Sequence, residues 1–357
     1  MAINVTKTFL PPIEEYKNYL QTVWQSHWVT NRGDLVRELE EKLRKYLGVS
    51  DLLCVNNGTM AIQLAIRALE LSGEIVTTPF SYVATTSSIV WENCEPVFAD
   101  IDEETLTIDP NAVEEAINDK TTAILATHIF GNPCDVEAIE DIAKQHGLKV
   151  IYDAAHCFGV RYRGESILNW GDVSTLSFHA TKLFHTGEGG GVVCRDPEIS
   201  KRVYYMHNFG HKGPEDFQGL GINGKMSELQ AAMGLAVLPH IDEVIEGRRE
   251  VTERYEELLS FKNFRKPTIR EGTEWNYAYY PVVFERHGDL ENCVTRLNKL
   301  DIFPRRYFYP SLDSLPYVST RSELAVSSRV ADNILCLPLF HDLSDDDQRL
   351  ICRTVNG

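Results

Sequence analysis

The sequence contains no long hydrophobic run, no closely spaced cysteine pair and no excess of positive charge. Without eighteen consecutive apolar residues, it offers no helical membrane span. The eight cysteines are scattered without a C-x-x-C pair, so we expect reduced thiols, and we predict no metal site. There are 35 basic and 52 acidic residues, and the resulting net charge of −17 argues against a general nucleic-acid-binding protein.

Internal repeats and low-complexity segments are also missing. The first residues lack the charged start and the long apolar region of a signal peptide, so we expect a cytoplasmic protein that binds no membrane. The 357 residues are 43% hydrophobic, which is a normal balance for a globular protein with a sizeable core. The pattern changes where a highly charged helix is expected over 241–259. We therefore predict a large domain, residues 1–240, and a smaller one, residues 241–357.

Apolar spacing predicts that helices and strands alternate along most of the chain. Helices are expected at 12–24, 34–47, 60–71, 111–118, 135–146, 241–259 and 289–300. Strands are expected at 52–55, 74–79, 123–127, 150–152, 173–178, 192–194 and 279–284. Such alternation predicts an α/β fold with a mostly parallel sheet and right-handed crossovers.

One lysine stands in an unusual setting. The stretch Ser177–Gly191 reads SFHATKLFHTGEGGG, and it places Lys182 between two short apolar strands in a glycine-rich bend. In a confined, partly desolvated place the pKa of a lysine falls, and its amine becomes a nucleophile or a Schiff-base partner. From this stretch alone, a solvated loop lysine is the alternative.

An acidic residue upstream favours the catalytic interpretation. Asp153 ends the apolar strand of VIYDAAH, and the carboxyl ends of parallel strands are where open α/β sheets bind ligands. An acid there can hold a proton on a pyridine nitrogen, which makes the ring an electron sink. His156 follows three residues later. A role in the site and a purely structural role are equally good interpretations of this histidine.

One further segment is compatible with a phosphate site. Gly58 and Thr59 lie between an expected strand and an expected helix, and a helix N-terminus offers free N–H groups and the positive end of a dipole. Asn223 precedes another helix, and the residues alone indicate ordinary helix capping there.

These motifs together resemble a known family. DAAHCFG and SFHATKLFHTGEGG are similar to the sugar aminotransferases of the DegT/DnrJ/EryC1/StrS family, which are pyridoxal-phosphate (PLP) enzymes of fold type I, the aspartate-aminotransferase fold. The resemblance implies that Lys182 and Asp153 are catalytic. It implies cofactor contacts from Gly58, Thr59, Tyr82, Asp153, His156, Ser177, Lys182 and Asn223. It implies substrate contacts from Thr30, His185, Arg305 and Tyr309.

The resemblance also implies an activity and an assembly. We expect amino transfer from L-glutamate to a nucleotide-linked keto-sugar, in a homodimer whose shared sites take Asn223 from the other subunit. One branch of the family replaces the lysine with histidine and dehydrates or deoxygenates sugars, but this chain keeps Lys182. The compact HATKLFHTGEGG form looks most like enzymes that aminate carbon 4 of dTDP-4-keto-6-deoxy-D-glucose for cell-surface polysaccharide. Two alternatives to this activity are an aminotransferase that acts at carbon 3 and a regulatory relative that has no turnover.

Overall fold

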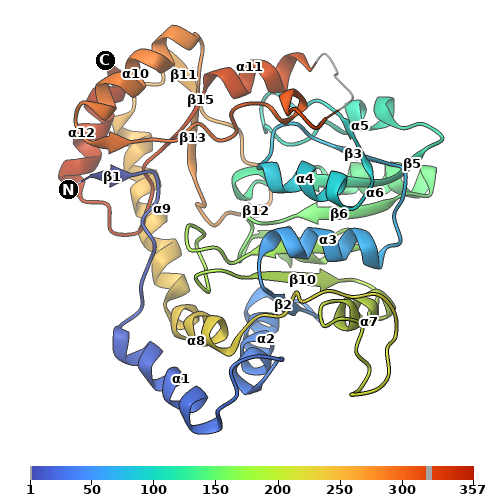
Figure 1. Ribbon diagram of the computed structural model, residues 1–357. Helices are drawn as coiled ribbons and strands as arrows, with labels where there is room; N and C mark the ends of the chain where they lie inside the picture. Colours follow the sequence, from blue (N-terminus) through green and yellow to red (C-terminus); the bar gives the residue numbers. More distant parts are fainter. Residues whose placement is uncertain (1, 319–323) are drawn as a thin grey trace.

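A seven-stranded sheet forms the centre of the chain in the computed structural model, which describes residues 2–318 and 324–357 (Figure 1). In sheet order, its strands are β2 (Leu53–Val55), β10 (Gly190–Cys194), β9 (Val173–Ser177), β6 (Lys149–Asp153), β5 (Thr121–Thr127), β3 (Glu74–Thr77) and β4 (Glu95–Phe98). The pairs β3–β4, β3–β5, β5–β6 and β6–β9 are parallel, whereas β10 runs antiparallel to both its neighbours. The predicted α/β fold with a mostly parallel sheet is therefore confirmed.

The described helices include the seven for which a range was predicted, close to their predicted positions, and others for which none was predicted. They are α1 (Ile13–Ser26), α2 (Asp34–Leu47), α3 (Gly58–Ala68), α4 (Val83–Trp91), α5 (Pro110–Ala116), α6 (Val136–His146), α7 (Pro197–Met206), α8 (Glu228–Val237), α9 (Ile241–Leu258), α10 (His287–Asn298), α11 (Ala325–Asn333) and α12 (Asp345–Asn356). No helix in the described ranges combines the length and the apolar content that a membrane span requires.

The short strands β7 (Arg161–Tyr162), β8 (Glu165–Ser166) and β12 (Thr273–Glu274) form a small sheet of their own. The remaining strands are β1 (Ile3–Asn4), β11 (Phe264–Arg265), β13 (Tyr280–Phe284), β14 (Ile302–Phe303) and β15 (Ile334–Leu337).

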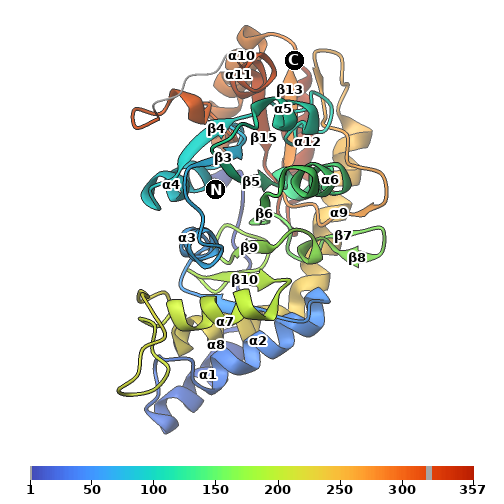
Figure 2. The ribbon, with the colours of Figure 1, turned by 90° about the vertical axis from the view of Figure 1, so that its right-hand side faces the viewer.

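The large sheet is buried on both faces. Along β5, Ile124 and Ala126 belong to one apolar cluster, whereas Ala123 and Leu125 belong to another, because successive side chains of a strand point to opposite faces. Helix α3 lies over β9 and β10 on one face, and α8 packs against both α1 and α2 at the lower end of the molecule (Figure 2). Burial on both faces explains why these strands read as continuous apolar runs.

A third apolar cluster surrounds the antiparallel sheet β11-β13-β15, which α10 and α12 cover. Helix α9 contributes to two cores, because Val244 packs in a cluster of the large sheet and Tyr255 packs in this third cluster. The N-terminal strand β1 pairs with β14, far along the chain. The division of the chain at residue 240 therefore stays a prediction.

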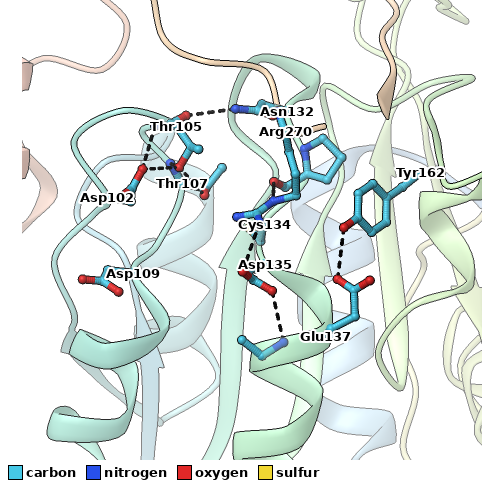
Figure 3. Close-up of polar contacts among 12 residues, drawn as sticks. Asp102, Thr105, Thr107, Asp109, Asn132, Cys134, Asp135, Glu137, Tyr162 and Arg270 are labelled. Carbon is cyan, nitrogen blue, oxygen red and sulfur yellow. Dashed lines mark hydrogen bonds and ion pairs between the residues drawn. The ribbon is translucent and has the colours of Figure 1, made fainter. Parts of the chain in front are cut away.

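A polar network joins the segment after β11 to loops of the large sheet (Figure 3). Arg270 Nη1 lies 3.0 Å from Asp135 Oδ2, at the start of α6. Asn132 Nδ2 donates to the carbonyl oxygens of Thr105, at 3.1 Å, and Thr268, at 2.9 Å. These contacts fix the segment at 268–270, which leads into residues that support the site described next.

Candidate active site

A cavity of about 780 Å³ opens beside the carboxyl ends of β6 and β9 and the N-terminus of α3. Eight of the residues singled out in the sequence line this cavity. They are Gly58, Thr59, Tyr82, Asp153, His156, Ser177, Lys182 and Arg305. The parallel topology brings them together, because strands that are distant in sequence end at the same edge of the sheet.

Asp153 is the last residue of β6, between β5 and β9, and is only 5% exposed. Its Oδ2 accepts a hydrogen bond from the Thr85 hydroxyl at 2.8 Å, and its Oδ1 accepts one from the Ala155 N–H at 3.1 Å. Burial raises the pKa of Asp153, while these two donors and the charge of Lys182 oppose that rise. The carboxylate is thus held in one orientation at the floor of the cavity.

Lys182 lies in the turn between β9 and β10, with its Nζ 6.0 Å from the centroid of the Tyr279 ring. Burial lowers the pKa of Lys182 to about 8. Asp153 and Tyr82 oppose this shift, and the positive charge of Arg305 adds to it. A substantial fraction of the amine is therefore neutral slightly above physiological pH, as a nucleophilic lysine requires.

His156 is buried, and its Nδ1 accepts a hydrogen bond from the Phe130 N–H at 3.1 Å. The proton of the neutral imidazole is therefore on Nε2. Burial, together with the charge of Lys182, keeps the pKa of His156 well below its ordinary value. Asn276 Nδ2 donates to the His156 carbonyl at 2.8 Å, so the segment after Arg270 supports the loop that carries this histidine.

Backbone donors and a hydroxyl lie together at the start of α3. Asn57 caps this helix by accepting the Met60 N–H at 2.8 Å, and Gly58 and Thr59 form its first turn beside Ser177. A Cβ at Gly58 would lie 2.9 Å from Ser177 Cβ, so only glycine lets the helix end approach β9 this closely. The arrangement is suited to an anion at a helix N-terminus.

Four predicted site residues lie outside the cavity. Thr30 is in an exposed bend, and Tyr309 is half exposed, with its ring 3.6 Å from the Arg306 guanidinium. His185 is buried and bonded through both ring nitrogens to backbone atoms. Asn223 is exposed, and its Oδ1 accepts from Lys225 Nζ at 2.7 Å. This chain's own cavity receives none of these four side chains.

Sequence reasoning missed several residues at the cavity. Tyr279 and Tyr307 form part of its wall, and the Arg305 guanidinium lies 4.6 Å from the centroid of the Tyr307 ring. His179 and Glu188 also line it, with His179 Nε2 3.7 Å from Glu188 Oε1. His179 and Glu188 belong to the motif around Lys182, so they could have been predicted as cavity residues from the sequence. Nothing near Tyr279 in the sequence indicates a ligand.

The large sheet is mostly parallel, and a lysine and an aspartate line one cavity at the carboxyl ends of its strands. These features define a fold type I, PLP-dependent transferase. The chain belongs to the DegT/DnrJ/EryC1/StrS aminotransferase family, whose model matches residues 12–356. PLP is the cofactor of this family, and the chain is an aminotransferase.

Individual relatives match along nearly the whole chain. A dTDP-4-amino-4,6-dideoxy-D-glucose transaminase of Shigella dysenteriae is 42% identical, over 99% of this chain and 98% of the relative. A transaminase of the same name from Escherichia coli is 39% identical, over 97% and 95%. The solved structure of DesI in the presence of its TDP-sugar product superposes with a TM-score of 0.94 at 31% identity, covering 99% of this chain and 92% of DesI.

Proposed function

We propose that this enzyme transfers the amino group of L-glutamate to carbon 4 of dTDP-4-keto-6-deoxy-D-glucose. The product would be a 4-amino-4,6-dideoxyglucose unit, made in the cytoplasm for cell-surface polysaccharide such as O-antigen. The observation that carries this proposal is the likeness to two transaminases of that name over nearly the full chain. The division into a cofactor-binding domain, residues 1–240, and a smaller domain, residues 241–357, belongs to the same proposal.

The residues of the cavity fit PLP. The N–H groups of Gly58 and Thr59 and the hydroxyl of Ser177 form an anion cradle in which a Cβ at Gly58 would clash, and this cradle would hold the phosphate. Asp153, on the cavity floor, would hold a proton on the ring nitrogen. His156 would donate from Nε2 to the ring's 3′ oxygen.

Tyr82 completes the proposed cofactor pocket. Its side chain is 52% exposed at the start of α4 and lines the cavity. An aromatic ring there would stack on the face of the pyridine ring, as flat π systems prefer.

PLP, when bound, supplies an electron sink for the negative charge that develops at the donor's α-carbon. The neutral amine of Lys182 would attach the resting cofactor covalently. Once released, the same amine would accept the proton of the donor's α-carbon, because its pKa of about 8 suits a base near neutral pH. Asp153 would keep the ring nitrogen protonated throughout, so the two side chains divide the work between proton transfer and electrostatic stabilisation.

A cation on the cavity wall would help to hold the acceptor. Arg305 lines the cavity close to Tyr307, and a guanidinium is well shaped to bind a diphosphate through two hydrogen bonds. A local cation of this kind is what an anionic nucleotide sugar needs on a protein whose net charge is −17.

We further propose a homodimer with shared sites. The segment between α7 and α8 projects from the body of the molecule (Figure 1). It carries the exposed side chains of Phe209, Phe217, Leu220 and Ile222 next to Asn223. Clustered exposed apolar side chains mark interaction surfaces. A second copy would cover them, and its cavity would receive Asn223.

Mixing two inactive variants tests this sharing. We expect Lys182→Ala and Asn223→Glu each to be inactive alone, because one lacks the lysine and the other puts a negative charge beside the cofactor phosphate. After subunit exchange, a mixed dimer would hold one site with both lesions and one with neither, so activity should return in up to about half its sites. The measurement is glutamate-dependent turnover after mixing.

Exchange is confirmed by mass tags on the two variants, and Lys182→Ala mixed with itself is the negative control. Proven exchange without recovery would mean that Asn223 serves its own chain or only its own segment. A fully active monomer in sedimentation would refute the shared site outright.

The choice of substrate is tested with a panel of keto-sugars. Purified enzyme, PLP and L-glutamate are incubated separately with dTDP-, UDP- and GDP-linked 4-keto-6-deoxy sugars and with a dTDP-3-keto-6-deoxyhexose, and the products are identified by NMR. We expect the dTDP-4-keto sugar to react with the highest kcat/KM, with the new C–N bond at carbon 4. Preference for another nucleotide, or amination at carbon 3, would contradict the proposal.

A further inference from the structure

A segment near the N-terminus connects the C-terminal part of the chain with the turn that carries Lys182. We call residues 3–10 the N-terminal strap. It begins in β1, where Ile3 and Asn4 pair with Ile302 and Phe303 of β14. From there it runs beside α9 towards α1 (Figure 1). The Val5 carbonyl accepts the Leu339 N–H at 3.0 Å, so the first half of the strap is fixed to the C-terminal part of the chain.

The second half of the strap is bonded to the turn that carries Lys182. The Thr8 hydroxyl donates to the Ala180 carbonyl at 2.8 Å. His185 Nε2 lies 2.6 Å from the Phe9 carbonyl. These two anchors bracket Lys182, one lying two residues before it and the other three residues after it.

The protonation of His185 is set by its partners. Its Nδ1 accepts the Gly187 N–H at 3.2 Å, so the ring proton is on Nε2 and is donated to Phe9. Burial lowers the pKa of His185 and keeps the ring neutral. The buried imidazole is therefore fully bonded, and its geometry is that of an anchor for the strap instead of a substrate contact.

The middle of the strap is fixed as well. The Phe9 ring packs at 5.4 Å from the His240 ring and at 5.3 Å from the His341 ring. Lys7 forms an ion pair with Asp342. The strap is thus held by contacts at both ends and in between.

These contacts connect two walls of the cavity. Arg305 follows β14 by two residues and lines one wall, while Lys182 stands on the other, between the anchors of the strap. We infer that the N-terminal strap is a positioning element, which holds the Lys182 turn in register with the Arg305 segment through Thr8 and His185. This inference rests on the proposed role of Lys182 as the lysine that carries PLP.

Thr8→Val removes one anchor while keeping the shape of the side chain. Thr6→Val is the matched control, because Thr6 lies in the same strap and its hydroxyl makes no hydrogen bond within residues 2–318 and 324–357. Thr8→Ser restores the hydroxyl and should restore function. Thr8→Ala repeats the loss without the second methyl group, in case valine disturbs folding.

The first readout is the pKa of Lys182 in cofactor-free protein, from competitive acetylation over pH 6–11 with peptide mass spectrometry. We expect a midpoint of about 8 in the parent protein. Thr8→Val should raise it by roughly 0.5 to 1 pH unit, because a looser turn admits water and relieves the desolvation of the amine. Thr6→Val and Thr8→Ser should keep the parent value.

The second readout is kinetic. A misplaced lysine slows proton transfer more than it weakens substrate binding, so kcat should fall about tenfold in Thr8→Val with KM for L-glutamate changed less than twofold. Borohydride reduction of the parent holoenzyme shows separately whether Lys182 carries PLP. Reduced PLP found on another lysine would contradict the proposed function. If the reduced PLP is on Lys182, two results would contradict the positioning role of the strap. One is a Thr8→Val variant whose Lys182 midpoint and kcat match the parent. The other is a Thr6→Val variant whose midpoint and kcat change as much as those of Thr8→Val.

Discussion

Lys182→Ala is expected to reduce glutamate-dependent amination by roughly 10⁵-fold, the scale of losing a residue that is both nucleophile and base. Nothing else in the described part of the cavity replaces its amine, because the other amine or guanidinium side chain there is Arg305, and a guanidinium is not among the groups that form covalent intermediates. The phosphate cradle and Asp153 remain intact in this variant. We therefore expect it still to bind PLP, without a covalent bond.

Three measurements check this expectation. Steady-state turnover gives the loss, absorbance after gel filtration shows whether PLP is retained, and borohydride reduction with peptide mapping locates the covalent bond in the parent enzyme. Lys201→Ala is the matched control, because Lys201 lies exposed on α7 with its nearest carboxylate, Glu198, 3.7 Å away. A covalent label on another lysine, or a Lys182→Ala variant within tenfold of the parent, would remove Lys182 from its proposed role.

Asp153→Asn is expected to lower kcat by about 10³-fold, or about 4 kcal/mol of transition-state stabilisation. Asparagine has nearly the same shape, and its side-chain oxygen can still accept one of the two hydrogen bonds from Thr85 and Ala155. It carries no negative charge, however, and cannot hold a proton on the ring nitrogen. Single-turnover kinetics with L-glutamate isolate this step from sugar binding.

A graded variant separates charge from orientation. Thr85→Val deletes the hydroxyl that bonds Asp153 Oδ2 but keeps the charge, so we expect a loss of only about tenfold, the value of one hydrogen bond to a charged group. Asp109→Asn, at the N-cap of α5, should leave kcat within twofold. Nearly normal turnover of Asp153→Asn would refute the proposed role of the Asp153 charge in catalysis. So would a Thr85→Val variant whose kcat falls as much as that of Asp153→Asn.

Local patterns predicted much of the fold and drew attention to Lys182 and Asp153, which line the cavity. The apolar spacing of residues 34–47 predicts the helix that α2 forms, and the apolar run before Asp153 predicts β6. Both follow from neighbours along the chain, because amphipathic periodicity and strand alternation are local properties. The glycine-rich bend around Lys182 was likewise recognisable, since β9 and β10 flank it closely.

Other features depend on contacts between distant residues, and no local pattern carries them. Helix α4 reads VATTSSIVW, and its β-branched residues favour a strand, yet packing against α3 makes it a helix. Thr85 reaches Asp153 across the sheet, and Tyr279 reaches the vicinity of Lys182 from nearly a hundred residues away.

Contacts between distant residues also explain why His185 lies outside the cavity. The family resemblance implied a substrate contact for this residue, whereas in the structure the N-terminal strap packs over it and His185 is buried against Phe9. Residue types near a bend indicate which chemistry is available there. Which way each side chain points depends on the elements that pack around the bend, and those elements come together only when the whole chain has folded.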